Sequence, residues 1–134
     1  VAIKEASGNI SQIAQVAHLC GDKIDIYSGN DDQIVPVLSL GGKGVISVLS
    51  DLMPAATSKM CHDYLEGNTA AATKAQLELL PLVDALFSEV NPIPAKAAMA
   101  KMGFGENYLR LPLTPMEEQN AEKLFALMRE QGLI

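Results

Sequence analysis

Three short runs of apolar, β-branched residues place the strongest constraint on how this chain can fold. They occupy residues 1–4, 24–28 and 45–49, and each precedes a polar or glycine-containing turn and then a helix-like pattern. Strands that alternate with helices form parallel βα units, because each helix returns the chain to the start of the next strand. The sequence therefore predicts an α/β fold built on a parallel sheet.

The helical patterns after the first two runs have recognisable beginnings and ends. Asn9 is a suitable cap for the first helix, whose apolar residues recur at three- and four-residue spacing until Gly21. Asp31 or Asp32 is predicted to cap the second helix, which runs through residue 40 and ends at Gly41.

The second half of the chain has no further β-rich run and is predicted to be helical. Three helices are expected there, at residues 54–66, 69–90 and 94–102. A fourth begins at Thr114, Pro115 and Glu117, which have the spacing of a capping box with proline at the first helical position. Gly132 is expected to end this last helix.

The charge balance and the cysteine content exclude several classes of function. Sixteen Asp and Glu residues against ten Lys and Arg residues give a net charge of −6, which repels the phosphates of nucleic acids. No apolar run reaches the roughly 18 residues that span a bilayer. Cys20 and Cys61 cannot form a disulfide framework, which favours a reducing cytoplasm. Together with the charge and the short apolar runs, this predicts a cytoplasmic protein with no nucleic-acid or membrane partner.

Three parallel strands make an incomplete sheet. A parallel sheet normally has both faces covered, and a closed (β/α)8 barrel takes about 250 residues, whereas this chain has 134. The chain also opens directly on an apolar run at Val1, with no initiator methionine. We therefore expect a piece of a longer protein whose missing portion lies upstream of Val1.

Lys4 is the first candidate for chemistry, because it stands at the end of an apolar strand. The two-residue alternation of a strand puts Lys4 on the same face as Ala2. Burial there would favour the neutral amine, which attacks a ketone or an aldehyde to form a Schiff base. The alternative is an exposed lysine, or one paired with Glu5, at a strand end. The position in the sequence does not separate these two interpretations.

A second candidate follows the next strand, in the run from Ser28 through Gly29 and Asn30 to Asp32. These short polar residues close a strand and open a helix, where backbone N–H groups can meet an anionic substrate. Ordinary turn and helix-cap chemistry explains the same residues equally well.

Structural roles are predicted for the remaining motifs. The glycines in residues 41–44 precede a strand and lack the ending of a phosphate-binding loop, so they predict an αβ turn. His18 with Cys20, and Cys61 with His62, lack the spacing of a metal site and are expected to be partly buried structural residues.

Five segments of the chain resemble the dihydrodipicolinate synthase family, also called 4-hydroxy-tetrahydrodipicolinate synthases. They are VAIKEASGN at residues 1–9, YSGNDD at 27–32, LGGKGVISV at 40–48, NPIPAK at 91–96 and LRLPL at 109–113. The segments occur in the family's order, and the chain is similar to the C-terminal part of that family's subunit along its whole length. The resemblance implies a (β/α)8 TIM barrel. Residues 1–66 would supply strands six to eight with their helices, and residues 67–134 a C-terminal helical extension.

The resemblance also implies a pyruvate-dependent lyase that works through a lysine Schiff base. Lys4 would attack the ketone of pyruvate, and the resulting enamine would add to L-aspartate-4-semialdehyde, on the route to diaminopimelate and lysine. Ile46 would line the pyruvate pocket, while Gly29 and Asn30 would border the substrate. Asn30 stands where family members often have Asp, and Asp51 where Asn is common. No metal or organic cofactor is implied.

The family is typically a homotetramer of two dimers, and the resemblance would put Ile10, Ser11 and Leu40 at the contact between dimers. Two alternatives remain open. One is another pyruvate-dependent enzyme, an N-acetylneuraminate lyase or a 2-keto-3-deoxy-sugar-acid aldolase, which uses the same lysine with a different aldehyde. The other is a non-catalytic half-barrel that serves in folding or assembly and exposes its sheet edges.

Overall fold

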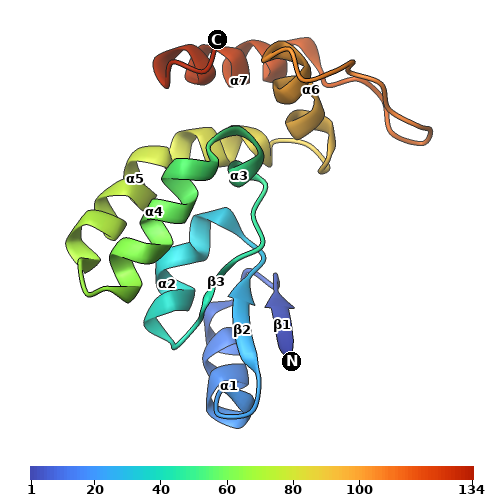
Figure 1. The fold of residues 1–134 in the computed structure, drawn as a ribbon. Helices are drawn as coiled ribbons and strands as arrows, with labels where there is room; N and C mark the ends of the chain where they lie inside the picture. The colour runs from blue at the N-terminus through green and yellow to red at the C-terminus, as the bar shows by residue number, and fades with distance from the viewer. The chain divides into compact units, whose positions relative to one another are not determined.

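The computed structural model describes residues 1–134, which form two compact units, Val1–Glu78 and Leu79–Ile134 (Figure 1). The first unit holds the sheet, and the second is helical. The division between the units falls within a helix, after Glu78. The predicted boundary after residue 66 is a different one, because it marks the end of the βα units of a barrel. That boundary stays a prediction.

The first unit is built on three parallel strands in the order β1-β2-β3, which confirms the α/β class and the parallel sheet. The strands are β1 (Ala2–Glu5), β2 (Asp25–Ser28) and β3 (Gly44–Val45). In their register Lys4 pairs with Tyr27, and Tyr27 pairs with Gly44. Because paired residues point to the same face of a sheet, these three residues share one face.

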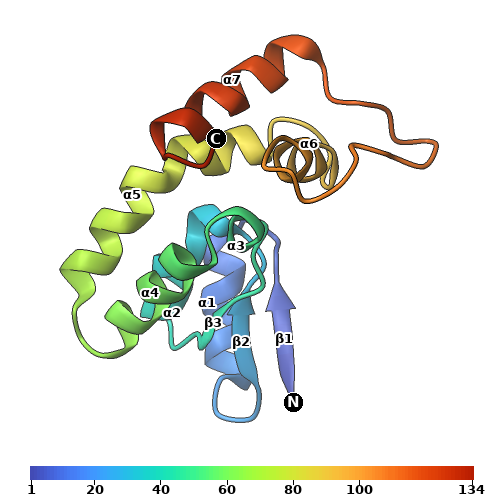
Figure 2. The same cartoon turned by 45° about the horizontal axis from the view of Figure 1, so that its top comes forward.

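The opposite face of the sheet is covered by α1 (Ile10–Cys20) and α2 (Ile34–Ser39). Ile26 of β2 packs there with Ile13 and Val37 in one buried cluster. Figure 2 shows both helices on the same side of the sheet. Asn9 caps α1 as predicted, since its side-chain oxygen accepts hydrogen bonds from the backbone N–H groups of residues 11 and 12 at 3.0 and 3.3 Å.

The helix after β2 begins differently from the prediction. A short 3₁₀ turn, η1 (Asp31–Gln33), precedes α2, and neither Asp31 nor Asp32 caps the helix that follows them. The predicted cap is therefore wrong. Asp31 instead directs its carboxylate to the loop after β3, where it accepts two backbone hydrogen bonds. The predicted glycine turn before β3 is confirmed, with Gly41 at a φ of +91°.

The third strand is shorter than predicted. Only Gly44–Val45 pairs with β2, and the predicted strand at residues 45–49 already turns into α3 (Leu49–Leu52). The hydrogen bonds from the N–H groups of Val48 and Leu49 to Asp31 explain the difference. A β-rich composition predicts an extended backbone, but a distant acceptor bends it into a helical turn.

Two long helices follow, α4 (Pro54–Leu65) and α5 (Thr69–Leu86). Their positions confirm the predicted helices, although α5 ends before the predicted limit at residue 90. Pro54 is at the start of α4, where its missing N–H group has no helical partner. No helix of the chain combines the length and the apolar character needed to cross a membrane.

The second unit contains the end of α5 together with α6 (Ile93–Lys101) and α7 (Glu118–Glu130). The predicted capping box at Thr114 is wrong, because α7 begins after Glu117 and has no side-chain cap from its own N-cap residue. Glu89 fulfils that role from outside the helix. Its Oε1 accepts a hydrogen bond from the N–H of Glu117 at 2.9 Å and another from Nδ2 of Asn120 at 2.9 Å.

Candidate functional site

The predicted site residues lie where the three parallel strands end. Loops that leave neighbouring parallel strands at their carboxyl ends form the binding edge of many α/β proteins. Here the N–H of Gly29 donates to the carbonyl of Glu5 at 2.7 Å, and the N–H of Ile46 donates to the carbonyl of Ser28 at 2.8 Å. These two bonds join the loops after β1, β2 and β3 into one continuous edge.

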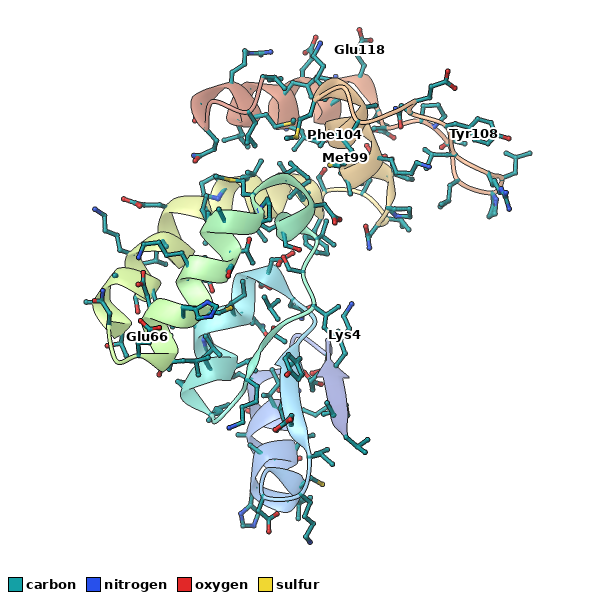
Figure 3. The ribbon with its side chains drawn as sticks, in the orientation of Figure 1. Lys4, Glu66, Met99, Phe104, Tyr108 and Glu118 are labelled. Carbon is teal, nitrogen blue, oxygen red and sulfur yellow. The ribbon has the colours of Figure 1, made fainter.

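Lys4 is on the sheet face that the helices leave open. Its neighbour Glu5 points the other way, toward α1, where the carboxylate accepts a hydrogen bond from Nε2 of Gln12 at 3.1 Å. Since successive strand residues alternate between faces, Lys4 points away from α1. Figure 3 marks Lys4 at the carboxyl end of β1. The predicted shared face of Lys4 and Ala2 follows from the same alternation.

The surroundings of Lys4 match the exposed alternative that the sequence left open. The side chain is exposed rather than buried, because β1 is an edge strand that pairs only with β2. It is also not paired with Glu5, whose carboxylate is buried and engaged by Gln12 and by the N–H of Ser7. The ion pairs of the chain are Lys59 with Asp63 and Lys74 with Glu78.

Gly29 leaves room for the lysine. A Cβ atom at this position would lie 2.9 Å from Cε of Lys4, 3.1 Å from its Cγ and 2.6 Å from Cβ of Ala6. All three separations are below a normal carbon–carbon contact of about 3.5 Å. The structure thus brings Lys4 and Gly29, two of the predicted site residues, into direct contact.

Asn30 continues this edge in a tight turn. The hydroxyl of Ser28 donates to the carbonyl of Asn30 at 2.8 Å and accepts from its N–H at 3.2 Å. The side-chain amide of Asn30 faces Gly8, where a Cβ atom would be 3.7 Å away. The loop after β1 and the loop after β2 therefore meet at Asn30 as well as at Gly29.

Ile46 follows β3 at the same edge, and its side chain is 50% exposed. Strand β2 lies between β3 and β1, so Ile46 and Lys4 are separated by one strand. Neighbouring strands are about 4.8 Å apart, which puts the two backbones roughly 10 Å from each other. Tyr27, on the strand between them, shares the open face with Lys4.

The sequence does not predict the roles that two residues have at this edge, Tyr27 and Asp31. Tyr27 shares the open face with Lys4 through their register pairing, and pairing between distant strands is not encoded in any local pattern. Asp31 is predicted to cap the helix that follows it, but its partners are Val48 and Leu49, which are 17 and 18 residues away. A capping residue next to a helix start is a local signal, whereas an acceptor for a later loop is not.

A cavity of about 290 Å3 opens beside β3, and its lining includes Tyr27, Ser47 and Cys61. Burial, and to a smaller extent the charge of Asp31, raises the pKa of the Cys61 thiol above its ordinary value. His62 lines the same cavity, with Nδ1 2.9 Å from the carbonyl of Ser58.

His18 and His62 are both exposed, not partly buried as predicted, because each lies on the solvent side of its helix. Cys20 and Cys61 are half-buried, as expected. No three His, Cys, Asp or Glu residues are grouped so that they could hold a metal ion.

Comparisons with known proteins agree along the whole chain. The sequence model of the Dihydrodipicolinate synthetase family matches residues 1–131. The 4-hydroxy-tetrahydrodipicolinate synthase 1 of Clostridium acetobutylicum is 55% identical over 133 residues, which are 99% of this chain and 45% of that protein.

Solved structures give the same result. The crystal structure of dihydrodipicolinate synthase from Thermotoga maritima has a TM-score of 0.97 and 43% identity, over 100% of this chain and 46% of that one. A structure described as the first monomeric dihydrodipicolinate synthase variant has a TM-score of 0.96 and 42% identity, with the same coverage. The chain therefore spans a little less than half the length of the relatives that it matches.

Proposed function

Because the chain belongs to the dihydrodipicolinate synthetase family, we propose that it supplies the Schiff-base lysine of a pyruvate-dependent lyase. The observation that carries this proposal is the position of Lys4. It stands at the carboxyl edge of a parallel sheet, on the face free of helices, with its stem against a glycine. An amine in that place can reach a small keto acid that enters between Lys4 and Ile46.

The proposed reaction begins when the neutral Nζ of Lys4 attacks the ketone carbon of pyruvate. Loss of water gives an imine, and loss of a methyl proton then gives an enamine, whose electron pair is the nucleophile. The enamine carbon adds to the aldehyde of L-aspartate-4-semialdehyde. The substrate amine then closes the ring and displaces Lys4, which releases 4-hydroxy-tetrahydrodipicolinate and returns the free lysine.

Gly29, Asn30 and Ile46 would surround the keto acid in this proposal. Ile46 would form the apolar wall opposite the lysine, which favours the uncharged imine and excludes water. Asn30 would border the rim with a neutral amide where many family members carry a carboxylate. The product would enter the synthesis of diaminopimelate and lysine.

The sheet fits the last three strands of a (β/α)8 barrel. We propose that β1, β2 and β3 are strands six, seven and eight, that residues 1–66 hold these βα units, and that residues 67–134 are the helical extension. The open edges of β1 and β3 support this view, since a barrel has no free edges. An N-terminal part would then be the first partner of this chain and would cover the face around Lys4.

A homotetramer made of two dimers is proposed for the assembled enzyme. Ile10 would contribute to the contact between dimers, and it is exposed at the start of α1. Ser11 is exposed beside it, while Leu40 packs partly against the buried cluster around Ile13. The relative described as a monomeric variant makes the oligomeric state a property to measure rather than to assume.

The proposal is tested by trapping the imine. Two proteins are mixed with pyruvate and borohydride: the chain alone, and the chain joined to the N-terminal part of the Clostridium acetobutylicum relative. Their intact masses and peptide masses are then measured. We expect one pyruvyl adduct, on Lys4, in the joined protein. Lys4→Ala should abolish it, whereas Lys43→Ala, which removes another exposed lysine, should not.

Two results would contradict the assignment, namely an adduct that persists in Lys4→Ala or the absence of any adduct in the joined protein. Turnover with L-aspartate-4-semialdehyde, compared with N-acetylmannosamine and with sugar-derived aldehydes, then identifies the second substrate.

A further inference from the structure

We propose that Asp31 is a positioning residue for the keto-acid pocket, because its buried carboxylate fixes the loop at residues 46–49 that carries Ile46. The inference rests on the proposed function, since it assigns a role to a residue that does not itself touch the substrate. It concerns one relationship, in which an acidic side chain after β2 sets the position of an apolar side chain after β3.

The carboxylate of Asp31 is anchored to that loop by two hydrogen bonds. Its Oδ2 accepts from the N–H of Val48 at 2.9 Å and from the N–H of Leu49 at 3.0 Å. Asp31 is only 1% exposed, so water does not compete for these donors. Hydrogen bonds from backbone N–H groups to a carboxylate are stronger than those between neutral groups. The far end of the loop is therefore held firmly.

The near end of the loop has its own anchor. The N–H of Ile46 donates to the carbonyl of Ser28 at 2.8 Å, which continues the pairing of β2 with β3. Ser47 is thus the only residue between the two attachment points. With both ends fixed to the segment around residues 28–31, the backbone at Ile46 has little freedom, and the direction of its side chain is determined.

Asp31 is itself fixed from a third element, α5. The carbonyl of Asp31 accepts from Nε2 of Gln76 at 2.8 Å, and Oε1 of the same amide accepts from the N–H of Val35 at 3.1 Å. Gln76 is buried, so this clamp is also shielded from water. The position of Ile46 therefore depends on a chain of contacts from α5 through Asp31 to the loop.

Ile46 depends on this support because its own side chain packs little. Half of it is exposed, whereas Leu49 in the same loop is completely buried. A residue without packing of its own takes its position from the backbone. If the loop loosened, the apolar wall that Ile46 forms opposite Lys4 would move. The affinity for the keto acid would then fall before the reactivity of the Lys4 amine did.

Only one of the two carboxylate oxygens does this work. Oδ1 of Asp31 is buried and has no hydrogen-bond partner, while Oδ2 accepts both bonds. An asparagine could therefore keep the acceptor oxygen and put its amide nitrogen where Oδ1 now lies. A glutamate would keep the charge but move the acceptor by one methylene. The proposal predicts that Asp31→Asn is tolerated better than Asp31→Glu.

The first experiment measures hydrogen exchange at the amides of Val48 and Leu49 in the protein joined to a relative's N-terminal part. Asp31→Ala should accelerate exchange at both amides at least tenfold, and Asp31→Asn less than threefold. Asp32→Ala, which changes the exposed neighbouring carboxylate, is the matched control and should change nothing. Unchanged exchange in Asp31→Ala would overturn the anchor.

The second experiment measures the pyruvate concentration that gives half-maximal trapping at Lys4. We expect a tenfold or larger increase in Asp31→Ala or Asp31→Glu, with the saturated trapping rate within threefold of wild type and with near-normal values restored in Asp31→Asn. Two results would overturn the positioning role. One is an equal increase of the half-saturating pyruvate concentration in Asp31→Asn and Asp31→Glu, and the other is a lower saturated trapping rate at an unchanged half-saturating concentration. The comparison of Asp31→Asn with Asp31→Glu still tests the proposal if Asp31→Ala fails to fold.

The two proposals fail in different ways. If the wild-type joined protein forms no adduct, the proposed function and the pocket role of Asp31 both fall, while exchange at Val48 and Leu49 still reports whether the anchor exists. If the wild-type protein forms the adduct but Asp31→Ala binds pyruvate normally, only the inference about Asp31 is wrong.

Discussion

The stem of Lys4 occupies the space that a side chain at Gly29 would need. A Cβ atom on Gly29 would lie 2.9 Å from Cε of Lys4, and on its other side it would lie 2.6 Å from Cβ of Ala6. The lysine end can swing away, but the Ala6 methyl group is fixed to the backbone. The glycine after β2 thus determines where the lysine on β1 can go.

Gly29→Ala is expected to damage both stability and adduct formation. The new methyl group must displace the loop at Ala6, and overpacking of this kind costs about 1–3 kcal/mol. It also moves Nζ of Lys4, so imine trapping should slow at least tenfold. Urea unfolding and the trapping rate measure the two effects.

Gly44→Ala is the matched control for that substitution. It adds the same methyl group to a neighbouring strand, where the nearest atom, a ring carbon of Tyr27, would be at an ordinary 3.4 Å. We expect it to be the milder change in both assays. If the two variants were equally impaired, the contact between Lys4 and Gly29 would not be the cause.

Ile46→Ala should separate binding from stability. Because the side chain is half exposed, its loss should change the free energy of unfolding by no more than about 0.5 kcal/mol. The pyruvate concentration for half-maximal trapping should nevertheless rise several-fold. Leu49→Ala in the same loop should destabilise by about 2–5 kcal/mol, since Leu49 is fully buried. A large loss of stability in Ile46→Ala would contradict an exposed wall residue.

Glu89→Ala should weaken α7, because it removes the acceptor for Glu117 and Asn120. The expected loss is about 1 kcal/mol, measured by thermal unfolding, with faster amide exchange at the start of α7. Glu89→Gln keeps an acceptor oxygen and should be close to wild type. Thr114→Ala tests the cap that the sequence indicated, and it should have little effect. A larger effect at Thr114 than at Glu89 would reverse the assignment.

The thiol of Cys61 should react more slowly with iodoacetamide at pH 8 in the folded chain than in the chain unfolded by urea. Burial first, and then the negative charge of Asp31, raises the pKa of Cys61, so less reactive thiolate is present. The same shift links folding to pH. The unfolded chain releases this proton at a lower pH than the folded one, so the contribution of Cys61 to stability is present at neutral pH and declines as the pH rises through the folded pKa.

The rate of Cys61 modification, followed by mass spectrometry from pH 7 to 10, checks this prediction. Asp31→Asn should move the midpoint toward lower pH, because it removes the smaller of the two causes. Identical profiles for Cys61 in the folded and the unfolded chain would show that burial does not affect the thiol.

Local signals in the sequence predicted the local parts of this fold. The cap at Asn9 and the glycine turn at Gly41 depend only on neighbouring residues, and both are confirmed. The alternation of β-rich and helical segments predicted the parallel sheet for the same reason. It also placed Lys4 at the end of a strand, where the structure has it.

The errors arose where a partner is distant in the chain. Asp31 bends residues 48 and 49 out of the predicted strand, and Glu89 replaces the predicted cap at Thr114. Neither hydrogen bond can be predicted from the few residues around either of its partners. The sequence also left open whether Lys4 is buried or exposed, since an apolar run does not reveal whether its strand lies at an edge.

The clamp at Gln76 has a consequence for the order in which the first unit folds. The side-chain amide of Gln76 bonds to Val35, 41 positions earlier in the chain, and to Asp31, 45 positions earlier. The hydrogen bonds of Asn9 and Glu5 span seven positions or fewer. Closing a longer loop costs more chain entropy, so contacts of this kind form after the local ones. We therefore expect α5 to dock late, and Gln76→Ala to accelerate unfolding far more than it slows refolding.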